Sequence, residues 1–155
     1  MGYAIYDSPF GKIKIGFTDQ AITVLQLVGM EEDVDAGVPS KLSDSAFSQL
    51  MEYFLGKRKT FAFPIEMQGT DFQKKVWQAL CDIPYGQTRS YKDIAIAIDN
   101  PKACRAVGMA NNKNPIAIVV PCHRVIGANG SLVGYAGGLQ MKSALLELEK
   151  INNNV

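Results

Sequence analysis

A cysteine and a histidine stand side by side in residues 121–125, which read Pro-Cys-His-Arg-Val. Cys122 is a candidate nucleophile, because a thiolate attacks electrophilic carbon, and His123 is a candidate base for the thiol proton. On an extended backbone neighbouring side chains point to opposite faces, so a bridging water joins such a pair more easily than a direct contact does. A Cys-His pair alone is more often structural than catalytic, so its interpretation depends on the surrounding sequence.

Cofactor chemistry finds little support in the composition. His123 is the only histidine, and three scattered cysteines (Cys81, Cys104 and Cys122) make a poor metal site, so we predict no metal. No GxGxxG motif indicates a dinucleotide, and we expect no cofactor. The odd number of cysteines argues against a disulfide framework. The longest apolar run, residues 116–120, is too short to cross a bilayer, and we expect a cytoplasmic protein with no membrane partner.

The elements that must position Cys122 and His123 begin, in chain order, with two segments typical of β-strands. Residues 12–15 alternate between polar and apolar side chains, and residues 21–28 are rich in β-branched ones. A helix is predicted from a cap at Ser43 to Leu55, with Gly56 ending it. The segment that follows, residues 56–69, is typical of a connector between two domains.

Helices dominate the second half. Thr70 and Gln73 form a capping box for a helix to about Leu80, and Ser90 is placed to cap a shorter one. Asn100, followed by a proline, is expected to cap a helix to about residue 111. Two short helices joined by a tight turn predict a helix-turn-helix.

A hairpin and a last helix follow the Cys-His pair. Residues 125–126 and 132–133 flank the dipeptide Asn129-Gly130, which is typical of a two-residue type I′ turn. Such a hairpin would be the wing of a winged helix. The last helix is predicted over residues 139–150.

These elements predict an α/β (α+β) protein in two parts. Residues 1–68 form a small mixed domain with a β-sheet, and residues 69–155 form a mainly helical domain with a winged helix-turn-helix. Formal charge differs between the parts, at −3 for the first and +4 for the second. A moderately basic second part is compatible with a phosphate backbone as partner, and equally with an ordinary mixed surface.

The segment around Cys122 has a wider likeness. Residues 114–126 resemble the active-site signature of the O6-alkylguanine-DNA alkyltransferase family, also called methylated-DNA–protein-cysteine methyltransferases. The likeness runs from about Phe72 to Glu149 in matching order and spacing, whereas residues 1–68 are similar only in length and strand pattern. Further matching segments are Pro84-Tyr85-Gly86, Ser90-Tyr91, Asn100-Pro101-Lys102-Ala103, Arg105-Ala106-Val107-Gly108, Tyr135, Gly137-Gly138 and Leu145-Leu146-Glu147-Leu148-Glu149.

The resemblance implies a role for each matching residue near the thiol. Cys122 is implied to be the alkyl acceptor and His123 its base, acting through a water. Glu149 is implied to orient the imidazole and to stabilise its charged form. Asn114 is implied to tie the recognition helix to the active-site loop, and Arg124 is grouped with it as support of the site.

The resemblance also implies how DNA is bound. Chemistry on O6 of guanine inside a duplex requires the base to leave the stack. Arg105 matches the finger that fills the resulting gap, and Tyr91 matches the tyrosine that crowds the phosphate and donates to the guanine ring. Small residues, including Ala106 and Gly108, let this helix lie close to DNA, and the family places it in the minor groove.

The pocket wall is implied to consist of Val125, Tyr135 and Ala136. The family often has serine at the last of these positions. Alanine lacks the hydroxyl but keeps the backbone N–H, so a contact to O6 is retained while substrate preference is left open.

The function implied is single-turnover transfer of an alkyl group from O6-alkylguanine in double-stranded DNA to Cys122. We expect a monomer, and O4-alkylthymine is left open as a second substrate. Three other functions are weighed against this one. A non-catalytic binder of alkylated DNA would not need Cys122, a helix-turn-helix regulator would leave the Cys-His-Glu set unused, and a cysteine hydrolase would turn over many times.

Overall fold

The computed structural model describes residues 1–29, 35–135 and 137–153, and the chain divides into two compact units. The first unit holds residues 1–68 and 115–117, and the second holds residues 69–114 and 118–155. Within the described residues, no helix is both long and apolar enough to cross a membrane.

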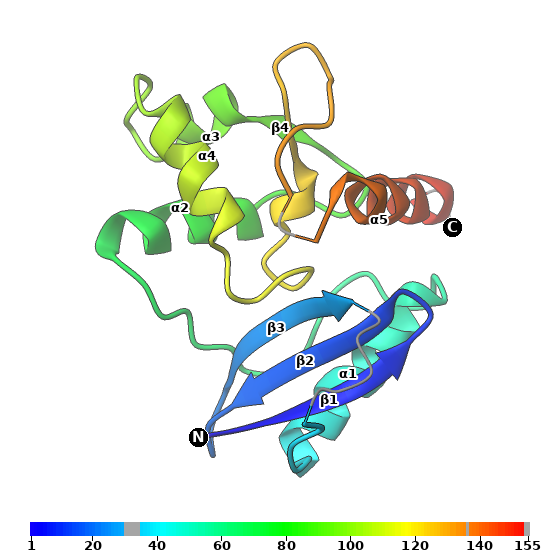
Figure 1. Ribbon diagram of the computed structural model, residues 1–155. Coiled ribbons are helices and arrows are strands. Elements are labelled where there is room, and N and C mark those ends of the chain that lie inside the picture. The colour runs from blue at the N-terminus through cyan, green and yellow to red at the C-terminus, as the bar shows by residue number, and fades with distance from the viewer. Residues whose placement is uncertain (30–34, 136, 154–155) are drawn as a thin grey trace. The chain divides into compact units, whose positions relative to one another are not determined.

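The first unit is built on a three-stranded antiparallel sheet in the order β1-β2-β3. Its elements are β1 (Gly2–Ser8), β2 (Gly11–Phe17), β3 (Ile22–Gly29) and the helix α1 (Lys41–Phe54). Figure 1 shows α1 lying against one face of this sheet, where Ile13 and Ile15 of β2 are fully buried. β1 was not predicted, while the two predicted strands are confirmed as β2 and β3.

Helix α1 begins earlier than the sequence predicted. Ser40, not Ser43, is the N-cap, because its hydroxyl accepts a hydrogen bond from the backbone N–H of Ser43. The Ser43 hydroxyl in turn accepts from the backbone N–H of Ser40 at 2.8 Å, which completes a capping box. Two serines three residues apart satisfy this pattern only from the earlier one, so the predicted cap at Ser43 was wrong.

A short segment from the second half of the chain extends the pairing of β3. The Leu25 N–H donates to the Pro115 carbonyl at 2.8 Å, and the Ala117 N–H donates to the Leu25 carbonyl at 2.9 Å. The next residue, Ile118, has a φ of 72°, a left-handed conformation that β-branched residues rarely adopt. The backbone is therefore strained four residues before Cys122.

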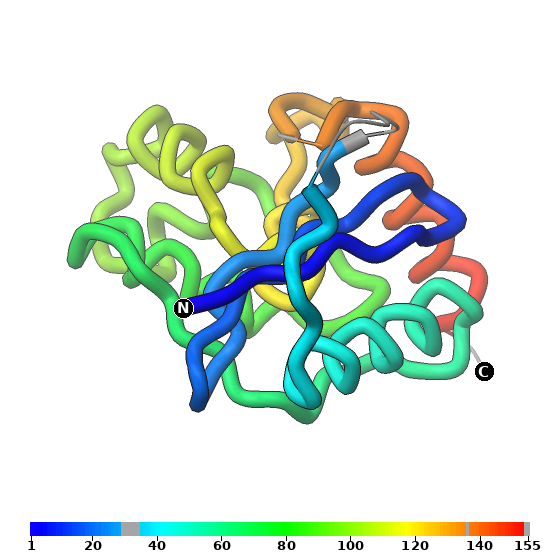
Figure 2. The backbone as a smooth tube through the Cα atoms, turned by 60° about the horizontal axis from the view of Figure 1, so that its bottom comes forward, coloured from blue at the N-terminus to red at the C-terminus, as the bar shows by residue number. Residues whose placement is uncertain are grey.

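The second unit is mainly helical. Its elements are α2 (Asp71–Cys81), β4 (Arg89–Ser90), α3 (Tyr91–Ala97), α4 (Cys104–Asn112), the 3₁₀ turn η1 (Cys122–Arg124), β5 (Val125–Ile126) and α5 (Leu139–Asn152). Helices α2, α3 and α4 pack against one another, and the tube in Figure 2 shows them together in green and yellow-green. The capping box predicted at Thr70 and the N-cap predicted at Ser90 are confirmed, and Ser90 forms a capping box with Asp93 as well. The α/β class, with a sheet-containing first unit and a helical second one, is confirmed as well.

Asn100 does not cap the second helix of the helix-turn-helix. Helix α4 begins at Cys104, its N-cap is Ala103, and no side chain caps it. Instead, the Asn100 carbonyl accepts from the Ala103 N–H at 3.0 Å and so closes a turn ahead of the helix. Asp99 has a φ of 60°, which redirects the chain just before this turn. An Asn-Pro pair serves turns and caps equally well, and here the turn prevails.

The predicted hairpin after Cys122 is also wrong. β5 pairs in parallel with β4, so that Val125 lies opposite Arg89, and no strand forms in residues 131–135. A type I′ turn needs a positive φ at both central residues, whereas Gly130 has a φ of 82° and Asn129 does not share that conformation. The Gly130 N–H instead donates to the Gly127 carbonyl in a local turn.

Trp77 links α2 to α4 in the interior of the second unit, and this link gives a first prediction. Its indole Nε1 donates to the Ala110 carbonyl at 2.9 Å, and the side chain is almost fully buried. Trp77→Phe removes the buried indole donor, which leaves the Lys113 N–H at 3.1 Å as a partner of that carbonyl, and it also removes ring area. We therefore expect unfolding in urea to show a loss of about 2 kcal/mol. Lys75→Ala, exposed on the same helix, is the control and should change stability little. Equal stabilities of the two variants would contradict the role given to the indole.

Candidate active site

Cys122, His123 and Arg124 form the 3₁₀ turn η1, and all three side chains are buried. The Cys122 N–H donates to the Val120 carbonyl at 2.8 Å, and the Arg124 N–H donates to the Pro121 carbonyl at 3.0 Å. The backbone here is therefore a turn and not the extended chain assumed from the sequence. A turn of this kind directs consecutive side chains into the interior of the same unit, where they meet α5.

The carboxylate of Glu149 is the centre of the site. Its Oε2 lies 2.6 Å from His123 Nε2 and 3.0 Å from Arg124 Nη2, and its Oε1 lies 2.8 Å from Arg124 Nε. The backbone N–H of Gly86 donates to Oε1 at 3.2 Å. Burial by itself raises the pKa of this carboxyl, but the hydrogen bonds and charges of His123 and Arg124 outweigh it and hold the pKa at about 2. The structure thus brings His123, Arg124 and Glu149 together.

The ionised carboxylate determines which nitrogen of His123 carries the proton. A carboxylate only accepts hydrogen bonds, so Nε2 must donate to it and must be the protonated nitrogen of the neutral ring. The lone pair is then on Nδ1, which is buried and has no hydrogen-bond partner in the described part of the chain. His123 is therefore arranged to accept a proton on Nδ1, and a direct hydrogen bond from the Cys122 thiol to that atom is not formed.

Burial keeps the reactive pair neutral at rest. It raises the pKa of the Cys122 thiol to about 11, although a hydrogen bond with the Asn114 side chain and the charge of Lys142 act in the opposite direction. Burial also lowers the pKa of His123, and the bond and charge of Glu149 only partly offset this. Near pH 7 the site therefore holds a thiol and a neutral imidazole, and the proton has to move when the thiol reacts.

Two asparagines connect α4 to this turn. Asn114 Nδ2 donates to the Val120 carbonyl at 2.7 Å, besides its bond with the thiol. Asn111, which sequence reasoning missed, is buried near the end of α4 and donates from Nδ2 to the Cys122 carbonyl at 3.3 Å. Its place in the buried stripe with Val107 and Ala110 was the signal that it faces inward.

Arg124 anchors the site to the end of α2. Its Nη1 donates to the Ile83 carbonyl at 2.7 Å, and its guanidinium lies 5.6 Å from the ring centroid of Tyr85. With both other nitrogens on Glu149, the guanidinium fixes the carboxylate in two directions. Arg124 is thus a partner of Glu149 and not a surface cation.

Tyr91 and α4 carry the residues predicted to face DNA. The Tyr91 hydroxyl donates to the Val133 carbonyl at 2.9 Å, so its proton already has an acceptor. Arg105 and Ala106 are exposed on α4. A Cβ added to Gly108 would meet only the Tyr91 ring, at an ordinary distance of 3.7 Å, so packing within the protein does not require glycine there.

The predicted pocket residues lie in two environments. Val125 is fully buried in β5, while the Tyr135 hydroxyl is buried with no hydrogen-bond partner among the residues described. Ala136 lies outside the described residues.

Lys142 is a further residue of the site region that sequence reasoning missed. Its side chain is completely buried on α5. It stands seven residues before Glu149, which places both on one face of the helix.

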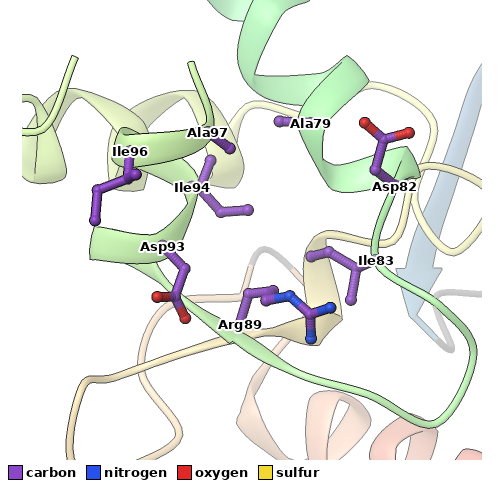
Figure 3. A pocket seen from close by; sticks show the side chains of 8 residues that line it. All are labelled: Ala79, Asp82, Ile83, Arg89, Asp93, Ile94, Ile96 and Ala97. Atoms are coloured by element: carbon purple, nitrogen blue, oxygen red, sulfur yellow. The ribbon is translucent and has the colours of Figure 1, made fainter. Parts of the chain in front are cut away.

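A separate cavity of about 530 Å³ opens between α2, β4 and α3 (Figure 3). Apolar side chains, among them Ile83 and Ile94, line it together with Asp82, Arg89 and Asp93. Cys122, His123 and Glu149 do not line this cavity. Within the described ranges no group of three or more His, Cys, Asp or Glu side chains is placed to hold a metal ion.

The comparison with known families covers both units. A family model described as "6-O-methylguanine DNA methyltransferase, DNA binding domain" matches residues 71–151, and one described as "6-O-methylguanine DNA methyltransferase, ribonuclease-like domain" matches residues 1–67. The chain belongs to this methyltransferase family. The resemblance predicted from the sequence is thereby confirmed, and it includes the first 67 residues, where only length and strand pattern had indicated it.

Relatives of the methyltransferase family match over almost their whole length. The methylated-DNA–protein-cysteine methyltransferase of Methanosarcina barkeri is 47% identical over 158 residues, which cover 98% of this chain and 99% of the relative. The constitutive protein of that name from Bacillus subtilis is also 47% identical, with coverages of 97% and 96%. The Mycobacterium tuberculosis OGT, solved in complex with DNA, superimposes with a TM-score of 0.88 at 47% identity, covering 97% of this chain and 93% of that one.

The depressed pKa of Glu149 predicts how stability depends on pH. Its ordinary pKa is 4.5 and the folded value is about 2, so its contribution is complete above pH 4.5 and is lost as pH falls through 2. Glu149→Gln leaves the buried Arg124 without its anion, and we expect it to lower the free energy of unfolding at pH 7 by about 3 kcal/mol. Urea unfolding between pH 7 and about 2 should show the gap to wild type shrinking below pH 4.5.

The matched control is Glu147→Gln, which changes an exposed glutamate of the same helix. This variant should follow the wild type at every pH. A gap between Glu149→Gln and wild type that stays constant with pH would mean that the carboxylate charge does not stabilise the fold.

Proposed function

We propose that this chain repairs DNA by accepting the alkyl group of O6-alkylguanine on Sγ of Cys122, once per molecule. Methyl transfer from methylated DNA to a protein cysteine is the activity for which its relatives are named. The observation that carries the assignment to Cys122 is the buried turn that holds this thiol beside His123, whose Nε2 is bound by Glu149. Of the other two cysteines, Cys81 is exposed and Cys104 is half-buried, whereas Cys122 is buried.

The chemical step follows from the protonation states of the site. The thiol proton moves to Nδ1 of His123 through a bridging water, and the imidazolium is held by Glu149. The thiolate attacks the alkyl carbon, so an S–C bond forms while the C–O6 bond breaks and its electrons pass to the guanine. The guanine then takes up a proton, which His123 can return. The product is a thioether, and because no second nucleophile removes the alkyl group, the protein is consumed.

Access to O6 requires the damaged base to leave the double helix. We assign Arg105, exposed on α4, to fill the gap, and Tyr91, Val125, Tyr135 and Ala136 to surround the extruded base. The small exposed residues of α4 support a close approach to DNA, since packing within the protein does not require glycine at position 108. Tyr91 must exchange the Val133 carbonyl for the substrate when it donates to the base.

The remaining parts of the proposal concern the whole chain. Residues 1–68 act as the smaller domain, and residues 69–155 as the catalytic and DNA-binding domain. The DNA supplies the alkyl group, so the reaction needs no cofactor, and the protein acts as a monomer. Three free cysteines among the described residues support a cytoplasmic location.

Intact-protein mass spectrometry after incubation with DNA that carries O6-methylguanine tests the function directly. We expect a gain of about one methylene per protein molecule and no further repair of excess damaged DNA. Peptide mapping should place the methyl group on Cys122, and Cys122→Ser should bind this DNA without gaining mass. Mass gain on Cys81 or Cys104 would overturn the assignment, repeated turnover would indicate a hydrolase, and binding without any gain would indicate a non-catalytic binder.

Base extrusion gives a separate prediction for Arg105. Without the side chain that fills the gap, Arg105→Ala should repair duplex DNA at least about tenfold more slowly, and it should react normally with free O6-methylguanine. Single-turnover rates on both substrates measure this, with Lys75→Ala as an exposed control on another helix. An equal loss on both substrates would show that Arg105 acts through the structure of α4.

A further inference from the structure

Lys142 is a buried cation that the steps above leave without a role. Its side chain is completely buried on α5, and its ammonium Nζ donates to the Val133 carbonyl at 2.8 Å and to the Gly134 carbonyl at 3.3 Å. No carboxylate forms an ion pair with it among the residues that the structure describes. Burying an ammonium that has only carbonyl partners costs free energy. An anion close to this ammonium would offset that cost, and in the resting protein Lys142 has no such partner among the described residues.

The anion that fits is the thiolate of Cys122. Lys142, Leu145 and Glu149 are the buried residues of α5, which places the ammonium on the helix face that also holds His123. Burial lowers the pKa of Lys142, and the one ionisable group that raises it is Cys122. Reciprocally, the charge of Lys142 lowers the pKa of the thiol.

Other charged and titratable groups surround the same thiol. Tyr91 on α3, Tyr135 in the loop before α5, His123 in η1 and Glu149 on α5 all face this region. Tyr91 and Tyr135 have raised pKa values, chiefly through burial, so both stay neutral near pH 7. The charge of Lys142 also lowers the pKa of His123 and therefore opposes the imidazolium. Lys142 favours the anion that forms on sulfur and disfavours the cation that forms on the imidazole.

We propose that Lys142 is a positioning residue that supplies the counter-charge for the Cys122 thiolate and holds the loop of Val133 and Gly134 in place. The inference rests on the proposed function of Cys122. Lys142 keeps its own proton throughout, since the thiol proton goes to His123. By destabilising the imidazolium, Lys142 promotes the onward transfer of that proton to the departing guanine.

The role of Lys142 in holding the loop follows from a hydrogen-bond acceptor that it shares with Tyr91. The Val133 carbonyl accepts from both Tyr91 and Lys142, at 2.9 Å and 2.8 Å. When the Tyr91 hydroxyl turns to the substrate, the bonds from Lys142 remain and keep the loop from moving with it. The loop leads directly to Tyr135, whose position in the pocket then depends on Lys142.

Alkylation of Cys122 by iodoacetamide tests the charge without DNA. The reagent reacts with the thiolate, and quantitative peptide mapping separates Cys122 from the more exposed Cys81 and Cys104. Lys142→Gln keeps a hydrogen-bond donor and removes the charge, whereas Lys150→Met removes an exposed charge from the same helix. Both variants and the wild type are compared over a range of pH, after thermal unfolding has shown that they fold.

Lys142→Gln should react with iodoacetamide about tenfold more slowly at pH 7 and recover as pH rises. The reason is that a nearby positive charge lowers the pKa of a thiol by roughly one unit or more. Lys150→Met should follow the wild type. Superimposable profiles for Lys142→Gln and wild type would overturn the counter-charge. If Lys142→Gln fails to fold, Lys142→Arg is measured instead, since arginine keeps the positive charge. A pH profile of Lys142→Arg that is shifted to higher pH than that of the wild type would then overturn the counter-charge role.

The loop-holding task is tested with Lys142→Met, which removes charge and donors together. At saturating DNA and high pH, where the thiol ionises unaided, Lys142→Gln should regain wild-type methyl transfer and Lys142→Met should stay at least about tenfold slower. Equal recovery of both variants would overturn this task. Should the wild type transfer no methyl group at all, the function proposed for Cys122 fails, while the iodoacetamide profiles still decide the counter-charge.

Discussion

The site depends on one buried carboxylate. Glu149 is 1% exposed, and an anion taken out of water at that depth has to be surrounded by donors. It accepts hydrogen bonds from the ring of His123, from two nitrogens of Arg124 and from the backbone of Gly86. These donors belong to η1 and to the turn after α2, so satisfying the charge also fixes those segments against α5. The geometry of the thiol follows, since Cys122 begins the turn that His123 and Arg124 continue.

Burial has opposite effects on different members of the site. It raises the pKa of Cys122 and lowers that of His123, and both changes keep the pair neutral. The groups that oppose burial are the Asn114 amide and the Lys142 ammonium on the side of the thiol, and Glu149 on the side of the imidazole. A nucleophile kept as a thiol is protected from unwanted electrophiles. Reaction of such a thiol first requires loss of its proton, for which the unpartnered Nδ1 of His123 is an available acceptor in the described part of the chain.

Sequence reasoning reached as far as local patterns and a specific motif allow. The N-caps at Thr70 and Ser90 are local, because each hydroxyl and its partner are three residues apart, and both caps were predicted correctly. The cap at Asn100 and the hairpin at Asn129 failed because other local bonds compete equally well and tertiary pairing decides between them. Lys142 was missed for another reason: a lysine on a helix is ordinarily exposed, and only the folded chain shows that its face is turned inward.

The pairing of Leu25 with Pro115 and Ala117 has a consequence for the order of folding during synthesis. About ninety residues separate these partners, and closing so long a loop is slow compared with forming a hairpin. As the chain leaves the ribosome, the β1-β2-β3 meander can pair at once, but the outer backbone groups of Leu25 in β3 wait until residue 117 has emerged. By then α2, α3 and α4 are already synthesised, and Cys122 follows within five residues. The nucleophile is therefore added to the growing chain just after the segment that completes the first unit.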